Sequence, residues 1–571
     1  MTKERKKWPL LVGILLIATI YGGELAYIFS ITPVPCEDAY ITFRFSKNLA
    51  EGNGPVFNPG ERVEGYSNPL WMFSIAVASK LGLDIISCSR MAGALVNTLT
   101  LLLVWYIPWR WFAVRGVVSL GGPVLYLLFL PLQFYAASGL ETSLYTFLIT
   151  ATAAAIMWAG SSSARWTAAS SLLLLTALTR PEGAIFFAFY CLWLGWRYVV
   201  RKESLKPYLP GITLFLLLYG AFIIWRLSYY GLPLPNTYYA KGFLPLYMRF
   251  MVGFLITRGF FTNYTWFLFL FPFFLFVKIT DMRRALTPLY LFIAGGFVFS
   301  LIFAGWDWMP YFRYNLPVVP LMIICCQLLF AELWRTWAPT TGKKLLWAAL
   351  TVCILFSAIE QYWKDLSLNY RWRDIGEFAR FNQKTMGEWI RSELGTKPVI
   401  AIGDVGYLAY ISQATILDLY GLTNHSFAEI KARYGAPDIS LLPPSISFAT
   451  YKKKELELLL DLAPDYVFLY AMRMKISDTY PGSAAGIADE PSFKNNYEYM
   501  TSFYLIPDFT SELWPRSIHI IDVLDLSSGV ISWLRTGWVY NIYIRKNSPY
   551  PRFHIELGAD GKIKNIMAKK P

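Results

Sequence analysis

Charged residues are scarce in this chain of 571 residues. They make up 16% of the sequence, whereas hydrophobic residues make up 55% and aromatic residues 18%. This composition excludes an ordinary soluble protein for much of the chain and predicts one that faces lipid. The net charge of +14 then favours lysine and arginine at the cytoplasmic membrane surface, beside anionic lipid heads. We therefore expect membrane lipid, and no nucleic acid, among the partners.

The sequence also has few histidines and no cysteine spacing that is typical of a metal site. The only three histidines are His425, His519 and His554, all late in the chain, and the six cysteines show no repeated metal spacing. A His-rich zinc site and a histidine base are therefore excluded from the long apolar part that precedes them. Acid–base chemistry in that part is expected to depend on carboxylates.

The first apolar run sets the predicted orientation. Trp8–Ile31 exceeds the roughly twenty apolar residues that a helix needs to cross a bilayer. Four basic residues precede it, so the N-terminus is expected in the cytoplasm and the polar stretch after it outside. Apolar segments and basic loops then alternate, which predicts about eleven transmembrane helices and an extracytoplasmic C-terminus. Two of these spans are predicted at 117–137 and 345–362, and the short apolar piece 70–83 is predicted to dip into the outer leaflet.

The composition becomes that of a soluble domain near residue 363. We expect a transmembrane domain over residues 1–363, with its first outer loop at 32–89, and a soluble extracytoplasmic α/β domain over 364–571. A polar helix is predicted at 371–394, before the strands. The strand-like segments are 398–403, 414–419, 465–470 and 538–544. The predicted fold is thus a polytopic α-helical membrane protein with a C-terminal α/β domain.

Ionisable residues gather on the outer side of this predicted topology. They are Glu37, Asp38, Glu64, Glu141, Arg180, Glu182, Lys241, Asp307 and Arg313. Such groups at membrane depth are costly and tend to mark function. A transporter would carry them near the midplane of broken helices. Their position instead favours a site at the membrane surface, where a lipid head group and a water-soluble partner can meet.

The residue types suit transfer of a sugar from a lipid phosphate. Such a reaction needs a carboxylate to take a proton from the acceptor hydroxyl, and cations or a metal to stabilise the departing phosphate. Asp38, in a polar loop, stays ionised and suits the role of base. A divalent ion, Mg²⁺ or Mn²⁺, is left open as a cofactor, with Asp38 and Glu141 as its ligands.

Each of these residues also has a purely structural interpretation. An acidic pair in an exposed loop is usually only solvated. Glu141 and Glu182 precede predicted helices and could cap them, and Arg180 and Arg313 could be ordinary interface anchors. The aromatic residues Tyr238, Tyr239, Trp306 and Trp308 suit an aromatic belt. The convergence of acids and bases on one side favours the functional interpretation.

A long motif, EDAYITFRFSKNLAEGNGPVFNPGERVEGYSNPLW, fills residues 37–71. It resembles the first outer loop of the terminal arabinofuranosyltransferases of the mycobacterial cell wall and their bacterial relatives, which are polytopic GT-C glycosyltransferases. The resemblance continues in the family's order in SGLET (138–142), TRPEG (179–183), LPNTYYAK (234–241), GWDWMPYFRYNLP (305–317), GDVGYLAY (403–410) and LDLYGLT (417–423). It therefore extends over most of the chain.

The resemblance implies a polyprenyl-phosphate sugar donor, often decaprenyl-phosphate arabinofuranose, and a glycan acceptor outside the bacterial cytoplasmic membrane. Asp38 matches the acid proposed for catalysis in such first loops, and Glu37 and Glu141 are the other catalytic candidates. The substrate-binding candidates are Arg44, Glu64, Tyr66, Asn68, Lys80, Arg180, Glu182, Asn236, Tyr239, Lys241, Asp307, Arg313 and Asp404. Lys80, Lys241 and Arg313 fall where phosphate contacts are expected.

The chain departs from the family pattern at one place, because relatives often have Asp-Asp where it has Glu37-Asp38. If the first acid binds a metal or a sugar hydroxyl, its longer side chain would shift the donor preference. Two other functions stay open. One is a lipid-linked glycan transporter, and the other is a mannosyl- or aminoarabinosyltransferase on the same scaffold. We also expect Glu64 and Glu141 to orient sugar hydroxyls or an ion, and the outer domain to bind the acceptor.

Overall fold

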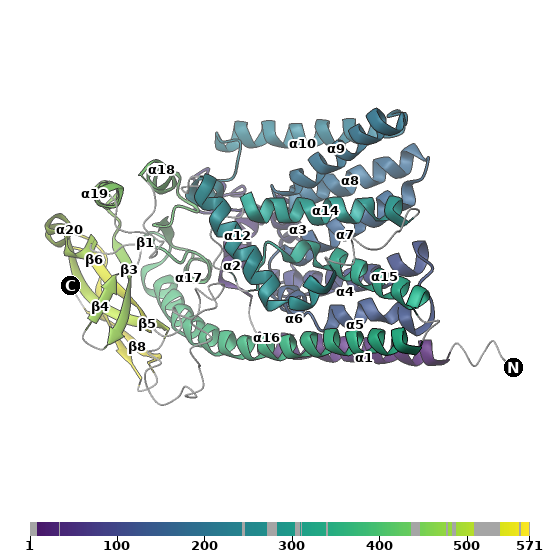
Figure 1. The fold of residues 1–571 in the computed structure, drawn as a ribbon. Helices are drawn as coiled ribbons and strands as arrows, with labels where there is room; N and C mark the ends of the chain where they lie inside the picture. Colours follow the sequence, from purple (N-terminus) through teal and green to yellow (C-terminus); the bar gives the residue numbers. More distant parts are fainter. Residues whose placement is uncertain are drawn as a thin grey trace.

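The protein consists of a bundle of helices joined to a smaller α/β domain, which lies beyond one end of the bundle (Figure 1). The computed structural model describes residues 8–32, 35–241, 246–270, 282–302, 309, 311–337, 341–434, 446–475, 478–481, 487–506, 537–558 and 561–569. The first helix begins at the far end of the bundle and runs towards the α/β domain.

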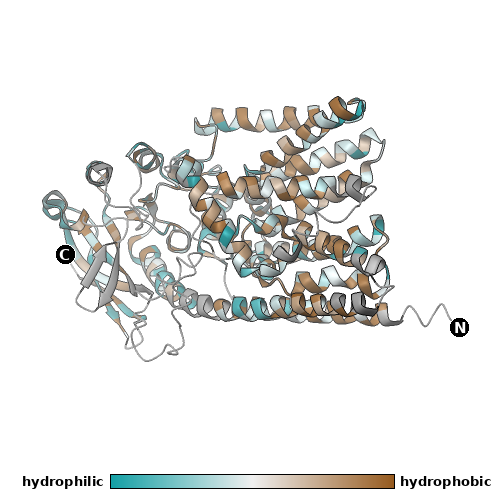
Figure 2. Cartoon of the chain, viewed as in Figure 1, coloured by the Kyte–Doolittle hydropathy of each residue, from teal (hydrophilic) through white to brown (hydrophobic). Residues whose placement is uncertain are grey.

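Apolar residues run along most helices of the bundle (Figure 2). These helices are α1 (Trp8–Ile31), α2 (Glu37–Ala50), α3 (Pro69–Lys80), α4 (Ile85–Trp111), α7 (Thr142–Ala159), α8 (Ser163–Thr179), α9 (Gly183–Arg201), α10 (Leu209–Tyr230), α11 (Asn236–Lys241), α12 (Leu246–Asn263), η2 (Thr265–Leu270), α14 (Met282–Ile302), η3 (Leu316–Val318) and α15 (Val319–Trp337). Among the described residues, α1, α4, α7, α9 and α10 are long and apolar enough to cross a bilayer. This confirms a largely helical, multi-pass protein, and the total of about eleven spans stays a prediction.

The predicted span at 117–137 is broken in the structure. It consists of η1 (Gly116–Leu120), α5 (Gly121–Leu127) and α6 (Leu130–Ala137), with a bend of 60° before α6. Pro131 causes the break, because it has no N–H to donate to the carbonyl four residues earlier. The Gln133 amide of α6 donates to the Tyr126 carbonyl of α5 (3.2 Å), a hydrogen bond that spans the bend.

A single long helix, α16 (Thr341–Trp389), connects the bundle to the α/β domain. It merges the predicted last span, 345–362, with the predicted polar helix, so the predicted boundary at residue 363 lies inside a helix. No proline interrupts this stretch, and the apolar residues of its first half give way to charged ones. One continuous helix therefore carries the chain out of the bundle, beside α1, to the strands.

The α/β domain contains a mixed sheet in the order β2-β1-β3-β6-β5, with β4 paired to β3, and a separate β7–β8 pair. Its elements are η4 (Ile390–Leu394), β1 (Val399–Ile402), α17 (Tyr407–Ser412), β2 (Thr415–Asp418), α18 (His425–Tyr434), α19 (Ile446–Leu462), β3 (Tyr466–Lys475), β4 (Asp478–Pro481), η5 (Ile487–Asp489), α20 (Pro491–Asn496), β5 (Tyr497–Ile506), β6 (Gly537–Arg545), β7 (Arg552–Leu557) and β8 (Ile563–Lys569). Strands β1, β2 and β3 are parallel, and β6 and β5 are antiparallel to their neighbours. The four predicted strands are confirmed.

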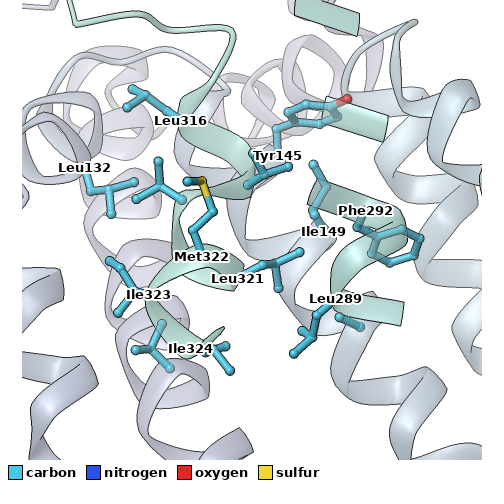
Figure 3. Close-up of a cluster of buried hydrophobic side chains, with 14 of the residues drawn as sticks. Leu132, Tyr145, Ile149, Leu289, Phe292, Leu316, Leu321, Met322, Ile323 and Ile324 are labelled. Atoms are coloured by element: carbon cyan, nitrogen blue, oxygen red, sulfur yellow. The ribbon is translucent and has the colours of Figure 1, made fainter. Parts of the chain in front are cut away.

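Apolar side chains from several helices interlock in the middle of the bundle (Figure 3). They include Leu132 of α6, Tyr145 and Ile149 of α7, Leu289 and Phe292 of α14, and Leu321, Met322, Ile323 and Ile324 of α15, all buried. Because lipid is as apolar as these side chains, helices inside a membrane associate through close van der Waals contact. This packing fixes the starts of α7 and α15 relative to each other, and the candidate site is built on both.

Candidate active site

A small cleft lies where α7 and α9 begin and where the chain enters η3. Its wall consists of Thr142, Tyr145, Arg180, Glu182, Phe186, Gly296, Phe299, Arg313, Tyr314 and Pro317. Two arginines and one glutamate thus face a wall that is otherwise largely aromatic. Such a combination of apolar surface and a few convergent polar groups is typical of a ligand site.

Arg180 lies between two carboxylates. It forms ion pairs with Glu141 through Nη1 and with Glu182 through Nε. Burial opposes its charge, but the two acids hold the pKa of Arg180 above its ordinary value. Neither glutamate makes a side-chain hydrogen bond to cap the helix that it precedes. The capping interpretation is therefore wrong for both, and their common partner is Arg180.

Glu141 has both carboxylate oxygens engaged. Oε1 accepts a hydrogen bond from Arg180 Nη1, and Oε2 accepts one of 2.7 Å from the Asn68 amide. Burial tends to raise the pKa of Glu141, but Arg180, Arg313 and Asn68 outweigh it and lower that pKa. Asn68 also bonds Thr42 of α2 (3.1 Å). Glu141 is thus a fixed carboxylate that connects the first outer loop to α7.

Asp38 lies at the rim of the cleft, in the first turn of α2. Its Oδ2 is 3.9 Å from Arg313 Nη1, and its side chain is 43% exposed while that of Arg313 is 7% exposed. The start of α2 is fixed by a hydrogen bond from the Cys36 N–H to the Ser138 carbonyl (2.9 Å). The structure therefore brings the first outer loop, the SGLET turn and the arginine of the 305–317 motif together, as the sequence predicts.

Arg313 is presented by an unusual turn. Tyr311 and Phe312, just before it, have φ of 65° and 53°, a left-handed conformation that costs non-glycine residues energy. The Tyr311 hydroxyl donates to the Asp365 carbonyl of α16 (3.1 Å), and the Tyr264 hydroxyl donates to Asp365 Oδ2 (3.2 Å). Packing against α16 thus holds this strained turn in place, which keeps Arg313 at the cleft.

Other predicted substrate-binding residues are saturated by the protein itself. The Arg44 guanidinium, buried and 1% exposed, donates to the carbonyls of Phe57, Ala409 and Ala414 and to Asn58 Oδ1, at 2.7–3.0 Å. It joins the first outer loop to the α/β domain, so its predicted role in substrate binding is replaced by a structural one.

Glu64 and Tyr66 are also buried. Glu64 forms an ion pair with Arg226 of α10 (2.8 Å), and both side chains are 1% exposed. Burial raises the pKa of Glu64 to about 7, against the lowering effect of Arg226. The Tyr66 hydroxyl contacts that of Tyr230 (3.0 Å). Neither residue lines the cleft, and their predicted contact with sugar hydroxyls or an ion does not fit this packing.

Three further candidates lie at the junction with the α/β domain. Glu37 Oε1 accepts hydrogen bonds from the backbone N–H groups of Gly406 (3.0 Å) and Tyr407 (2.8 Å). Asn236 donates to the Gly421 carbonyl (2.6 Å). Burial, followed by the nearby Asp404 carboxylate, raises the pKa of Glu37 to about 8. Asp404 follows strand β1, while Glu37 and Asn236 bind backbone groups that follow β1 and β2.

The remaining candidates lie away from these two groups. Lys80 ends α3 and is exposed, about 17 Å along the helix from Pro69, so its predicted phosphate contact does not fit. Tyr239 and Lys241 are half-buried on α11, outside the wall of the cleft. Asp307 lies outside the described residues.

Sequence reasoning missed Arg226, Tyr145 and Tyr314. Arg226 is a basic residue near the C-terminal end of the otherwise apolar α10, and a charge within an apolar helix was a usable signal. Tyr314 follows Arg313 directly, and its ring lies beside both cleft arginines. Tyr145 carried no signal, because one tyrosine in an apolar helix looks like any other core aromatic residue.

A metal bound by Asp38 and Glu141 does not fit the present arrangement. Both Glu141 oxygens already accept hydrogen bonds, and Asp38 faces Arg313. Within the described part of the chain, no three His, Cys, Asp or Glu side chains are grouped to hold a metal ion. We therefore derive no step through a metal.

Comparisons with known proteins give three kinds of similarity. A family model described as a domain of unknown function, DUF8728, matches residues 370–521. Among solved structures, ArnT from Cupriavidus metallidurans bound to undecaprenyl phosphate is 13% identical with a TM-score of 0.49, covering 72% of this chain and 86% of that one. The oligosaccharyltransferase AglB from Archaeoglobus fulgidus, in complex with an inhibitory peptide and a dolichol-phosphate, is 10% identical with a TM-score of 0.47, covering 86% and 80%.

Two curated relatives are named terminal beta-(1->2)-arabinofuranosyltransferase. The one from Corynebacterium glutamicum is 28% identical over 226 residues, which is 36% of this chain and 33% of the relative. The one from Mycobacterium tuberculosis is 29% identical over 232 residues, which is 36% of this chain and 34% of the relative. The match thus spans about a third of these relatives' length. Over that part the chain is similar to terminal arabinofuranosyltransferases, which confirms the resemblance that its motifs predict.

Proposed function

We propose that this protein is a membrane glycosyltransferase that moves a sugar from a polyprenyl monophosphate to an extracytoplasmic glycan. The single observation that carries the proposal is the pairing of the exposed carboxylate of Asp38 with Arg313, which lines the cleft together with Arg180. That is the charge arrangement that glycosyl transfer from a lipid phosphate requires. The sugar is arabinofuranose in this proposal, because the relatives' names and the first-loop motif both support it.

Asp38 acts as the general base. It takes the proton of the acceptor hydroxyl while the acceptor oxygen attacks the anomeric carbon of the donor. The bond from that carbon to the phosphate oxygen breaks, and its electron pair leaves with the polyprenyl phosphate. The Asp38 side chain is 43% exposed, which leaves its carboxylate accessible to an acceptor hydroxyl.

Arg313 and Arg180 stabilise the charge that develops on the departing phosphate. A guanidinium donates two parallel hydrogen bonds to a phosphate, and such bonds are stronger in a site with little water. Arg180 is already shared between Glu141 and Glu182, so it is rigid. Arg313 lies 3.9 Å from the base, Asp38, and is the primary phosphate ligand in this proposal, while Arg180 adds positive charge.

The reaction takes place at the outer face of a bacterial cytoplasmic membrane. The positive residues before α1 support an N-terminus in the cytoplasm, and α1 then leads to the first outer loop on the opposite side. The α/β domain lies at that end of the bundle, where it can receive a glycan acceptor.

The test uses the purified full-length protein in detergent with a labelled polyprenyl-phosphoryl arabinofuranose and an arabinan fragment. Transfer of label to the fragment is the expected result. Transfer only from a mannose or aminoarabinose donor would keep the mechanism and overturn the choice of sugar. The transporter alternative replaces this proposal if two results are found together. The protein cleaves no lipid-phosphate sugar, and after reconstitution it moves a lipid-linked glycan across the vesicle membrane.

A further inference from the structure

The start of α2 is held from two sides. On the bundle side, the Cys36 N–H bonds the Ser138 carbonyl (2.9 Å), and Arg380 of α16 donates to the Pro35 carbonyl (2.8 Å). On the side of the α/β domain, the Glu37 carboxylate accepts the N–H groups of Gly406 (3.0 Å) and Tyr407 (2.8 Å). Glu37 and Asp38 are adjacent, so whatever fixes the first also limits the movement of the second.

Gly406 has no room for a side chain. A Cβ atom at this position would lie 2.3 Å from the Glu37 carbonyl oxygen and 2.6 Å from Glu37 Oε1, far inside van der Waals contact. The close approach of these Glu37 atoms is by itself enough to exclude a side chain at this position. The turn after β1 thus approaches α2 as closely as a backbone can.

The surrounding contacts make this junction rigid. The Tyr40 ring packs on the rings of Tyr407 (4.7 Å) and Tyr410 (5.4 Å). Arg44, one turn further along α2, donates to the carbonyls of Ala409, within α17, and Ala414, just before β2. Buried hydrogen-bonded groups in such a junction are costly to separate, so the α/β domain and α2 behave as one unit at this point.

We call the two hydrogen bonds from the Gly406 and Tyr407 N–H groups to Glu37 the tie. These bonds need an acceptor oxygen at position 37 and do not need a negative charge. Both donors are backbone N–H groups, and burial together with Asp404 disfavours a negative charge on Glu37. A side-chain amide offers an equivalent carbonyl oxygen at nearly the same place. Glutamine at position 37 can therefore replace glutamate in the tie, although it cannot act as an acid, a base or a metal ligand of similar strength.

We propose that Glu37 is a positioning residue: the α/β domain, through Gly406 and Tyr407, fixes Asp38 at the rim of the cleft. The α/β domain is then part of the catalytic unit itself, beyond any role in binding the acceptor. This inference rests on the proposed glycosyl transfer for its activity readout, but the tie itself can be measured without activity.

The experiment compares Glu37→Gln, Glu37→Ala and Gly406→Ala with the wild-type full-length protein. Hydrogen exchange of the backbone amides in 403–412 reports the tie, and transfer kinetics report its consequence. Glu37→Gln is expected to keep amide protection and to stay within about threefold of wild-type kcat. Glu37→Ala and Gly406→Ala are expected to exchange at least tenfold faster and to lose at least tenfold in kcat, with the donor KM changed by less than threefold.

The outcomes separate the two proposals. Loss of kcat in Glu37→Gln equal to that in Glu37→Ala, with protection retained, would overturn the positioning role and make Glu37 a catalytic group. Unchanged protection in Glu37→Ala would also overturn it. A wild-type protein that transfers no sugar, yet shows the expected pattern of exchange, would contradict the proposed function and leave the tie established.

Discussion

The cleft and the junction between the first outer loop and the α/β domain use the same residue types in opposite ways. The side chains of Arg44, at the junction, and Glu64, in its pair with Arg226 of α10, are 1% exposed, and protein groups satisfy them. At the cleft, Asp38 keeps 43% of its side chain exposed and has its nearest cation at 3.9 Å. The comparison teaches that a charged side chain with its partners supplied by the fold contributes structure, whereas one that faces open space beside unlike charge is available for chemistry.

The largest effect is expected from breaking the buried pair between Glu64 of the first outer loop and Arg226 of α10. Arg226→Leu leaves the Glu64 carboxylate buried without its cation, which costs about 3–5 kcal/mol of unfolding free energy when Glu64 is ionised. Denaturation in detergent at pH 8 measures it. The double variant Glu64→Leu/Arg226→Leu is expected to recover most of the loss, and a double variant as unstable as the single one would contradict this account.

The pH dependence of stability tests the same pair. Burial raises the pKa of Glu64 from 4.5 to about 7. A carboxyl group whose pKa rises on folding stabilises the fold fully below about pH 4.5 and loses that contribution as the pH rises through about 7. Between these limits the loss is on the order of 3 kcal/mol. Thermal unfolding at several pH values should show a shallower decline for Glu64→Gln than for the wild type, and equal slopes would count against it.

A smaller effect is expected at the cleft, on activity alone. Arg313→Lys keeps the charge but loses the guanidinium fork that suits phosphate, so kcat/KM is expected to fall about tenfold, or ~1.4 kcal/mol. Lys80→Gln is the control, because Lys80 is exposed at the end of α3 and should change kcat/KM less than twofold. If Lys80→Gln loses more activity than Arg313→Lys, the cleft is not the phosphate site.

Three features were predictable from the sequence. These are the helical class, the strands, and the proximity of Asp38, Glu141, Arg180 and Arg313. Apolar runs and basic loops determine which helix ends lie on the same side of the membrane. Charged residues at those ends are then expected to lie near one another. The joining of 345–362 to the next helix was not predictable, because the composition changes while the helix continues.

The division of the charged residues between structure and function could not be predicted. Arg44 is satisfied by carbonyls up to 370 positions away, and Glu64 by an arginine 162 positions later. Pairings over such distances follow from how the domains dock, which local patterns in the sequence do not encode. The charge of Arg226 within the otherwise apolar α10 was the one local signal that Glu64 had a partner.

The most direct test of the central claim is the transfer rate of Asp38→Asn beside that of Glu51→Gln, an exposed acid at the other end of α2. If Asp38 is the base at the cleft, its amide variant loses at least a hundredfold in kcat, about 2.7 kcal/mol of barrier, with unchanged thermal stability. Glu51→Gln stays within twofold of the wild type. An Asp38→Asn enzyme that keeps more than a tenth of the wild-type kcat would contradict the claim that this carboxylate carries the chemistry.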